Sequence, residues 1–199
     1  MEKILFFGYT MDMGGAEKSL LDTVNFLSDK YDISLYLLDK KGILLKDLSN
    51  KVKVYEIKKN IFQYILFRYL PYFRKKTINR IANKEDYSFA VGYIEGRSAT
   101  WVSDIKKNIK KIAWIHCDVS KFDIGISDTE AKKTYDEMDK IICVSKMAKE
   151  SFCKKYSIPG DKISVIYNFI DAEEILRKSQ EKVTDCCKEK TFTFLNVGR

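Results

Sequence analysis

The chain has 199 residues, of which 45% are hydrophobic and 32% are charged, and its formal net charge is +8 at pH 7. This apolar content is enough for one sizeable core, and the 12 Phe and 12 Tyr with only 9 Gly and 2 Pro exclude a disordered or collagen-like chain. No apolar run is long enough to span a membrane, and the apolar stretch 4–9 is too short for a secretory signal. We therefore expect a cytoplasmic protein.

Short apolar runs alternate with helical patterns along most of the chain. Strands are predicted at 3–8, 33–38, 52–57, 89–94, 112–116, 140–144 and 163–167. Helices are predicted at 16–29, 97–105, 127–138 and 146–156, the last of them capped by Ser145, with a short helix at 171–177. This alternation predicts an α/β fold, in which right-handed crossovers build a Rossmann-like parallel sheet with helices on both faces.

The basic charge is concentrated between Lys51 and Lys84, where ten Lys and Arg residues accompany a single acidic residue, Glu56, for a balance of +9. Apolar and aromatic residues recur there at helical spacing and Pro71 interrupts them, which predicts a kinked helix or two short ones. Two interpretations stay open. Either the lysines of an ordinary amphipathic helix face water, or the segment Lys58–Lys84 lies on an anionic membrane surface. Nucleic acid is not an expected partner, because no nucleic-acid-binding module accompanies the charge.

The five cysteines and the single histidine do not have the spacing of a disulfide framework or of a zinc site. We therefore expect no metal and no cofactor.

Gly14 and Gly15 lie just before the first predicted helix, at the end of a strand where ligands of open parallel sheets bind. Their surroundings match neither the GxGxxG dinucleotide pattern nor the GxxxxGK[ST] P-loop pattern. Two glycines at a helix start can let a phosphate approach the backbone amides, or they can simply form a tight turn. The local sequence leaves both interpretations open.

His116 directly follows a predicted buried strand, where an imidazole could hydrogen-bond a sugar hydroxyl or exchange a proton near neutral pH. A lone histidine is also often a hydrogen-bonded structural residue. Glu95, Gly96 and Arg97 end the preceding strand, and Asp118 lies two residues after His116. Because carboxylates and a guanidinium around one cleft can hold carbohydrate hydroxyls, we predict that these four residues bind an acceptor. Each charged group could instead be a helix cap or part of a surface ion pair.

Four segments, in this order, resemble glycosyltransferase family 4 of the GT-B superfamily. MGGAEKSL (13–20) resembles the glycine-rich loop of that family, and KKIAWIHCDVSKF (110–122) resembles its loop with an acceptor-side histidine. IICVSKMAKESFCKKYSIPGDKISVIYNFID (141–171) is similar to the family stretch that ends in P-x-x-K-I-x-V-I-x-N-x-(I/V)-D. FTFLNVGR (192–199) resembles the strand that opens the donor-binding domain.

The resemblance implies the N-terminal, acceptor-side domain of a retaining glycosyltransferase. Such an enzyme transfers a sugar from a nucleotide-sugar donor to a saccharide or lipid-linked acceptor, and we expect a role in cell-surface polysaccharide or glycolipid synthesis at the inner face of the membrane. By this resemblance Gly14, Gly15 and Arg199 bind the donor phosphates, and His116 is the catalytic residue that contacts the transferred sugar or the acceptor. The family generally needs no metal.

The resemblance also predicts the domain organisation. Residues 1–178 are expected to form the acceptor-side domain, 179–190 a linker and 191–199 the first strand of a donor-binding domain. The donor-domain lysine and E-x7-E pattern of the family are absent from these 199 residues, so we expect little or no transferase activity from the chain alone. The alternative is a non-enzymatic membrane- or partner-binding module with a Rossmann-like fold. A nucleotide-dependent oxidoreductase is disfavoured, because GxGxxG is missing.

Overall fold

The structure of the chain is a computed structural model that describes residues 1–182, 194 and 196. The chain divides after Phe169 into two units, Met1–Phe169 and Ile170–Arg199. The strands of the described residues all belong to the first unit, and the second contains helix α7 (Ala172–Ser179).

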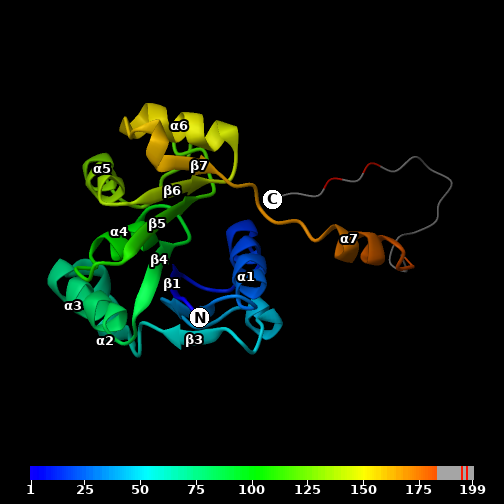
Figure 1. The fold of residues 1–199 in the computed structure, drawn as a ribbon, viewed down its shortest axis with the longest axis horizontal. Coiled ribbons are helices and arrows are strands. Elements are labelled where there is room, and N and C mark those ends of the chain that lie inside the picture. The colour runs from blue at the N-terminus through cyan, green and yellow to red at the C-terminus, as the bar shows by residue number, and fades with distance from the viewer. Residues whose placement is uncertain (183–193, 195, 197–199) are drawn as a thin grey trace. The chain divides into compact units, whose positions relative to one another are not determined.

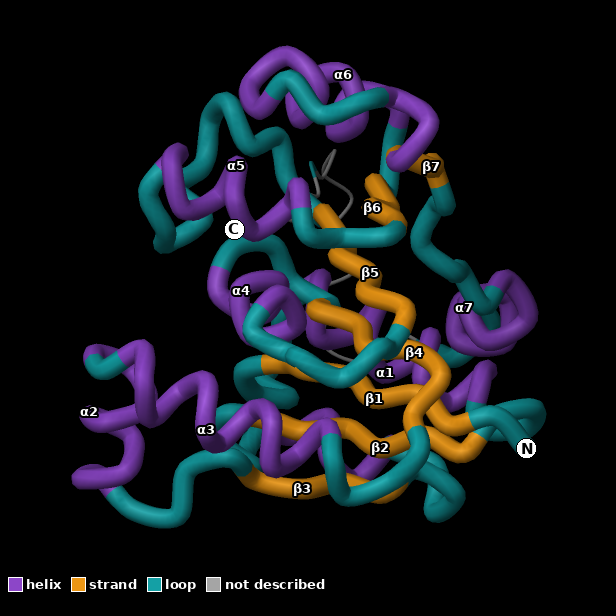
Figure 2. The backbone as a smooth tube through the Cα atoms, turned by 60° about the vertical axis from the view of Figure 1, so that its left-hand side comes forward, coloured by secondary structure: helices purple, strands orange, loops and turns teal. Residues whose placement is uncertain are grey.

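A single parallel sheet organises the first unit. Its strands are β1 (Lys3–Gly8), β2 (Asp32–Leu37), β3 (Lys53–Glu56), β4 (Tyr87–Gly92), β5 (Lys110–Ile115), β6 (Lys140–Cys143) and β7 (Ile163–Val165). Their order is β3-β2-β1-β4-β5-β6-β7, and every neighbouring pair is parallel (Figures 1 and 2). The predicted Rossmann-like sheet is confirmed. The strand order reverses between β1 and β4, which is the place where open α/β sheets form their ligand crevice.

Helices cover both faces of this sheet, as the sequence predicts (Figure 1). Helix α1 (Gly15–Leu27) and a 3-10 turn (Ile43–Asp47) pack on one face. The other face carries the helices α3 (Pro71–Ala82), α4 (Arg97–Ser103), α5 (Asp128–Asp136) and α6 (Lys146–Tyr156).

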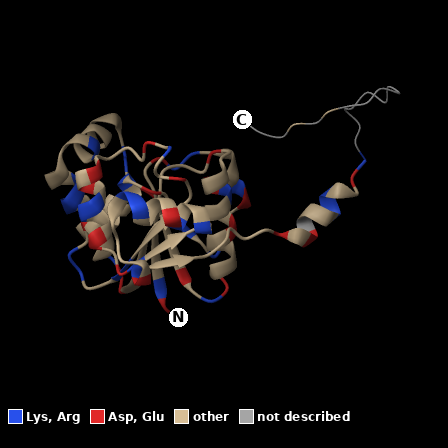
Figure 3. Ribbon diagram, turned by 90° about the horizontal axis from the view of Figure 1, so that it is seen from above, with Lys and Arg blue, Asp and Glu red and all other residues tan. Residues whose placement is uncertain are grey.

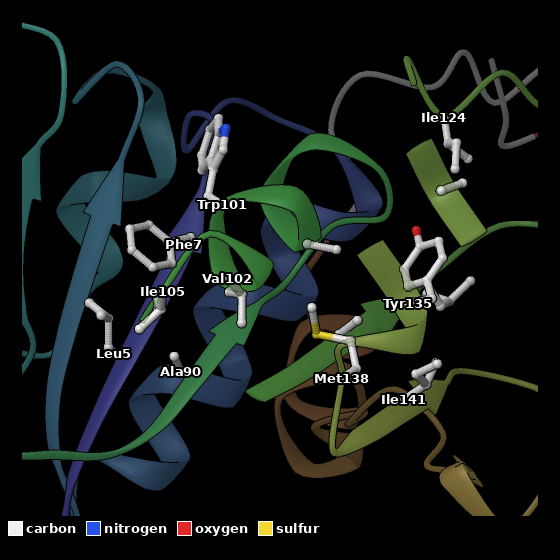
Figure 4. Close-up of a cluster of buried hydrophobic side chains, with 14 of the residues drawn as sticks. Leu5, Phe7, Ala90, Trp101, Val102, Ile105, Ile124, Tyr135, Met138 and Ile141 are labelled. Atoms are coloured by element: carbon white, nitrogen blue, oxygen red, sulfur yellow. The ribbon is translucent and has the colours of Figure 1, made fainter. Parts of the chain in front are cut away.

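The alternation of side chains along β1 explains why its apolar run is continuous. Leu5 and Phe7 belong to the core under α3 to α6, whereas Ile4 and Phe6 belong to the core under α1. Figure 4 shows the first of these cores, where Phe7 lies near Trp101 of α4. A strand that is buried on both faces needs apolar residues along its buried length, and the sequence KILFFG supplies them from Ile4 onward.

The basic segment forms two short helices, which confirms one of the two predicted forms. Asn60 caps α2 (Ile61–Tyr69) by accepting a hydrogen bond from the N–H of Gln63 at 2.9 Å. Pro71 occupies the first turn of α3, where a missing N–H costs nothing.

Ser145 caps α6 as predicted, since its Oγ accepts a hydrogen bond from the N–H of Ala148 at 3.0 Å. Other local predictions were wrong at their edges. The last strand ends at Val165 instead of residue 167, and the 3-10 turn Ile43–Asp47 was not predicted. Most of the predicted linker at 179–190 and of the predicted strand at 191–199 lies outside the described residues, so both stay predictions.

Candidate functional site

Gly14 and Gly15 form the start of α1 at the carboxyl end of β1. Gly14 is the N-cap residue in an extended conformation, and no side chain caps the helix. Gly15 is exposed and a Cβ atom on it would meet no atom within 4 Å, so a ligand has room beside the first turn, whose amides no side chain caps. A Cβ atom on Gly14 would instead lie 2.1 Å from Oε2 of Glu17, whose carboxylate folds back over Gly14. An incoming phosphate would have to displace that carboxylate.

Backbone hydrogen bonds hold the loop between β1 and α1 against the loop after β2. The N–H of Met11 donates to the carbonyl of Lys41 at 2.8 Å, and the Met11 carbonyl accepts from the N–H of Leu44 at 3.0 Å. Gly42 makes this approach feasible, because its φ is 116° and a Cβ atom would lie 2.1 Å from the Met11 carbonyl carbon. The loop that leads into Gly14 and Gly15 is therefore held in place by backbone hydrogen bonds to the loop after β2.

Tyr93, which follows β4, ties α1 to the sheet through a buried polar cluster. Its Oη lies 2.9 Å from Ser19 Oγ and 2.7 Å from Thr23 Oγ1, and it donates to the Ser19 carbonyl at 3.0 Å. Ser19 Oγ in turn donates to Oδ1 of Asn168 at 2.9 Å. Sequence reasoning missed Tyr93, because it read this residue only as part of an apolar strand.

His116 packs against the same tyrosine. The imidazole is half-buried, its ring centroid is 5.0 Å from that of Tyr93, and its Nε2 is 2.9 Å from the Tyr93 carbonyl oxygen. A carbonyl only accepts, so Nε2 carries the proton and Nδ1 of the neutral ring keeps its lone pair. Burial lowers the pKa of His116 below 6.5, although the negative charge of Glu95 opposes the shift. At neutral pH the residue can accept a hydrogen bond or a proton at Nδ1.

Glu95 positions the loop that carries His116. Its Oε2 accepts a hydrogen bond from the His116 N–H at 2.9 Å, and its negative charge also acts on the neighbouring Cys117 thiol. Burial, reinforced by Glu95, raises the pKa of Cys117 to about 12, which keeps this cysteine a thiol. Glu95 does not cap α4, because the N-cap of that helix is Gly96.

The titration of His116 can be measured cleanly, because it is the only histidine in the chain. We expect a pKa below 6.5, and a lower one still in Glu95→Gln, which removes the opposing negative charge. The unfolded chain takes up the proton first, so stability should fall as pH drops from about 6.5 toward the folded pKa. Nitrogen-15 NMR of the imidazole reports both the pKa and the tautomer. A pKa above 6.5, or a proton on Nδ1, would contradict the geometry described above.

Asp118 holds the loop after His116 against α6. Its carboxylate accepts hydrogen bonds from the N–H of Ser120 at 3.0 Å, from Ser120 Oγ at 2.6 Å and from Ser151 Oγ. These bonds, aided by Lys121 at 3.6 Å, lower the pKa of Asp118 to about 2. The structural contacts explain this residue, and its acceptor-binding role stays a prediction.

Gly96 and Arg97 begin α4. Gly96 is buried, and its N–H donates to Tyr135 Oη at 2.9 Å. Arg97 is half-buried, and its Nε donates to the carbonyl of Gly125 at 3.1 Å. Gly96 therefore serves packing in the structure, while the Arg97 side chain lines a pocket.

This pocket, which we call the α2–α4 pocket, combines aromatic faces with guanidinium groups and has a cavity volume of about 200 Å³. Its aromatic and cationic lining consists of Tyr9, Tyr64, Phe67, Arg68, Tyr69, Arg74, Arg97 and Trp101. Arg74 is neutralised by Asp104 at 2.7 Å, whereas Arg68 and Arg97 make no ion pair with any carboxylate in the described part of the chain. Aromatic rings beside such donors suit the apolar faces and the hydroxyl edges of a saccharide.

The predicted residues thus form two groups along one edge of the sheet. Gly14, Gly15 and His116 belong to the group on the α1 side, and Arg97 belongs to the α2–α4 pocket, whose lining includes none of those three. Glu95 connects the groups, because its carboxylate contacts His116 and it stands only two residues before Arg97. All of them follow β1, β4 or β5, which are adjacent parallel strands, so they share the carboxyl edge.

Arg199 lies outside the described residues, so its donor-phosphate role stays a prediction. Within residues 1–182, 194 and 196, no group of three or more His, Cys, Asp or Glu side chains is arranged to hold a metal ion. Among those same residues, no helix is both long and apolar enough to cross a bilayer.

The fold and its polar edge define a Rossmann-like domain of the type found in GT-B glycosyltransferases. The sequence profile of Glycosyltransferase Family 4 matches residues 13–174. The chain belongs to Glycosyltransferase Family 4. Comparison with curated proteins finds no significant match.

Solved glycosyltransferase structures share this fold. HepE of Anabaena, crystallised with UDP and glucose, is similar over 90% of this chain and 50% of its own, with a TM-score of 0.60 and 18% identity. The lipopolysaccharide outer core galactosyltransferase WaaB is similar over 85% of this chain and 46% of its own (TM-score 0.61, 15% identity). A glycosyltransferase of Rickettsia africae is similar over 89% and 49%, respectively (TM-score 0.59, 18% identity). The chain thus spans about half the length of the structures it matches.

Proposed function

We propose that this chain is the acceptor-side domain of a retaining glycosyltransferase, which transfers a sugar from a nucleotide-sugar donor to a saccharide or lipid-linked acceptor. The observation that carries the proposal is the neutral His116, held by Tyr93 so that Nδ1 keeps its lone pair at the carboxyl edge of the sheet. Membership of Glycosyltransferase Family 4 supports the reaction class. HepE is crystallised with UDP-glucose, which supports a UDP-sugar as the donor.

The two groups of residues suggest a division of labour. The uncapped amides at Gly15 would face the donor diphosphate, whose negative charge grows as the glycosidic bond breaks. The ring of His116 would accept a hydrogen bond from a hydroxyl of the transferred sugar or of the acceptor. The α2–α4 pocket would hold the remainder of the acceptor against Trp101 and Arg97.

The cellular setting is part of the proposal. We place the enzyme in cell-surface polysaccharide or glycolipid synthesis, at the cytoplasmic face of the membrane. The basic segment and the exposed apolar residues of α2 and α3 support a peripheral attachment.

Transfer of a radiolabelled sugar tests the proposed function. A protein that joins this chain to a donor-binding domain should transfer sugar from a UDP- or GDP-sugar to saccharide or lipid-linked acceptors without added metal. The 199-residue chain alone should show little or no turnover. Binding of NAD without any effect of nucleotide sugars would contradict the proposal. Normal turnover by residues 1–199 alone would contradict the need for a second, donor-binding domain.

A further inference from the structure

The basic residues between Lys51 and Lys84 fall into two classes in the folded chain. Five of them form ion pairs with carboxylates outside that segment: Lys51 with Asp29, Lys53 with Asp32, Lys58 with Asp39, and both Arg74 and Lys75 with Asp104. The other five make no ion pair with a carboxylate of the described residues, and they are Lys59, Arg68, Lys76, Arg80 and Lys84. Figure 3 shows basic and acidic segments interspersed over most of the ribbon. The second class therefore carries the positive charge that no carboxylate of the described residues offsets by an ion pair.

Three of these unpaired cations line one groove between α2 and α3. Lys59, Lys76 and Arg80 are all exposed, and the same groove is lined by Phe62 and Phe73. Residues 57–84 contain no Asp or Glu, so nothing within this segment competes for the cations. We call this feature the α2–α3 groove. It combines positive charge with aromatic side chains at one place on the surface.

Large apolar side chains of α2 and α3 are exposed instead of being buried in the core, and two of them, Phe62 and Phe73, line the groove. Phe62 is 66% exposed and Ile61 is 72% exposed, at the start of α2. The other large apolar residues of α2, of α3 and of the position between them that are at least 42% exposed are Ile65, Tyr69, Leu70, Tyr72 and Phe73. Aliphatic and aromatic side chains gathered around cations are typical of helices that lie at the boundary between lipid headgroups and acyl chains.

We propose that the α2–α3 groove binds the phosphate of an anionic phospholipid through Lys59, Lys76 and Arg80, while the exposed apolar side chains of α2 and α3 enter the outer acyl region of the bilayer. A soluble polyanion such as nucleic acid would match the three cations but would leave Ile61, Phe62 and their neighbours in water. An anionic lipid surface offers phosphates to the three cations and an acyl region to the exposed apolar side chains. The inference rests on the peripheral membrane attachment in the proposed function. It assigns that attachment to a site of defined residues.

The groove and the α2–α4 pocket share one wall. Phe67, which is only 5% exposed, lines both of them. A phospholipid in the groove would therefore set the opening of the acceptor pocket close to the membrane surface. This arrangement fits an acceptor whose sugar is linked to a lipid in the same bilayer.

Vesicle flotation of the 199-residue chain at low ionic strength tests the groove without any need for sugar transfer. We expect binding to vesicles of phosphatidylcholine with phosphatidylglycerol and none to phosphatidylcholine alone. The triple variant Lys59→Gln, Lys76→Gln, Arg80→Gln should weaken partitioning on the order of 100-fold. A matched control, Lys132→Gln, Lys133→Gln, Lys154→Gln, removes three exposed charges from α5 and α6 and should bind nearly as wild type does.

A second variant reads out insertion of the apolar side chains. Phe62→Trp places an indole at an exposed position, and its fluorescence should shift to the blue when anionic vesicles are added. The proposal is overturned if wild type does not bind anionic vesicles, if both triple variants lose binding equally, or if the indole stays in water on the vesicle. It is also overturned if the chain dimerises in solution and Phe62→Ser makes it monomeric. Failure of sugar transfer would leave these results unaffected.

Discussion

Gly96→Ala should destabilise the first unit by about 3 kcal/mol or more, because two penalties act at this one position. The backbone of Gly96 has φ 77° and ψ −116°, a conformation that residues with a Cβ atom rarely adopt. The added Cβ atom would also lie 1.9 Å from the carbonyl oxygen of Ile124, which is backbone and cannot turn away. The N–H bond to Tyr135 Oη would be strained as the two loops separate.

Gly125→Ala is the matched control for this prediction. Gly125 has a similar φ of 75°, but the nearest atom to its Cβ position is the flexible Arg97 Nε at 3.5 Å. It should therefore carry only the conformational penalty of about 1–2 kcal/mol. Chemical denaturation of both variants measures the difference. Equal losses of stability would show that the contact with Ile124 does not restrict the loop.

His116→Ala should lower kcat of the two-domain enzyme by roughly 100-fold or more, because it removes the acceptor lone pair at Nδ1 and the bond to the Tyr93 carbonyl together. Sugar transfer at saturating donor and acceptor measures this loss. Circular dichroism of the variant verifies that the fold is kept.

His116→Gln separates the two contributions. The glutamine amide can still donate to the Tyr93 carbonyl, and its Oε1 can accept a hydrogen bond, but it cannot take up a proton as Nδ1 of the imidazole can. We expect it to remain close to His116→Ala in kcat, while KM for the acceptor changes little. If His116→Gln restored full turnover, hydrogen bonding would suffice at this position and the basic nitrogen of His116 would not be needed.

Much of the sheet could be predicted from sequence, because strands buried on both faces have continuous apolar runs. KILFFG and KIIC fall within one residue of their predicted bounds for that reason. The cap at Ser145 and the helix break at Pro71 could also be predicted, since capping and helix interruption depend on local chemistry. The 3-10 turn Ile43–Asp47 was not, because it depends on the Met11 backbone, which is more than thirty residues away in sequence.

The candidate site was predictable in its residue types and less so in its contacts. Strand ends placed Gly14, Glu95 and His116 at one edge, since parallel strands share their carboxyl edge. The hydrogen bonds of Tyr93 to α1 and of Asp118 to Ser151 join segments that are far apart in the sequence. No local sequence pattern predicts such bonds. The aromatic lining of the α2–α4 pocket was likewise hidden, because it comes from α2, α4 and the loop after β1.

The position of a bound sugar tests the central claim most directly. In a crystal structure of the two-domain enzyme with a nucleotide sugar, we expect the sugar within hydrogen-bonding distance of the His116 ring and the diphosphate opposite Gly14 and Gly15. A nucleotide sugar bound at the amino edge of the strands, or with its sugar out of reach of His116, would contradict the account.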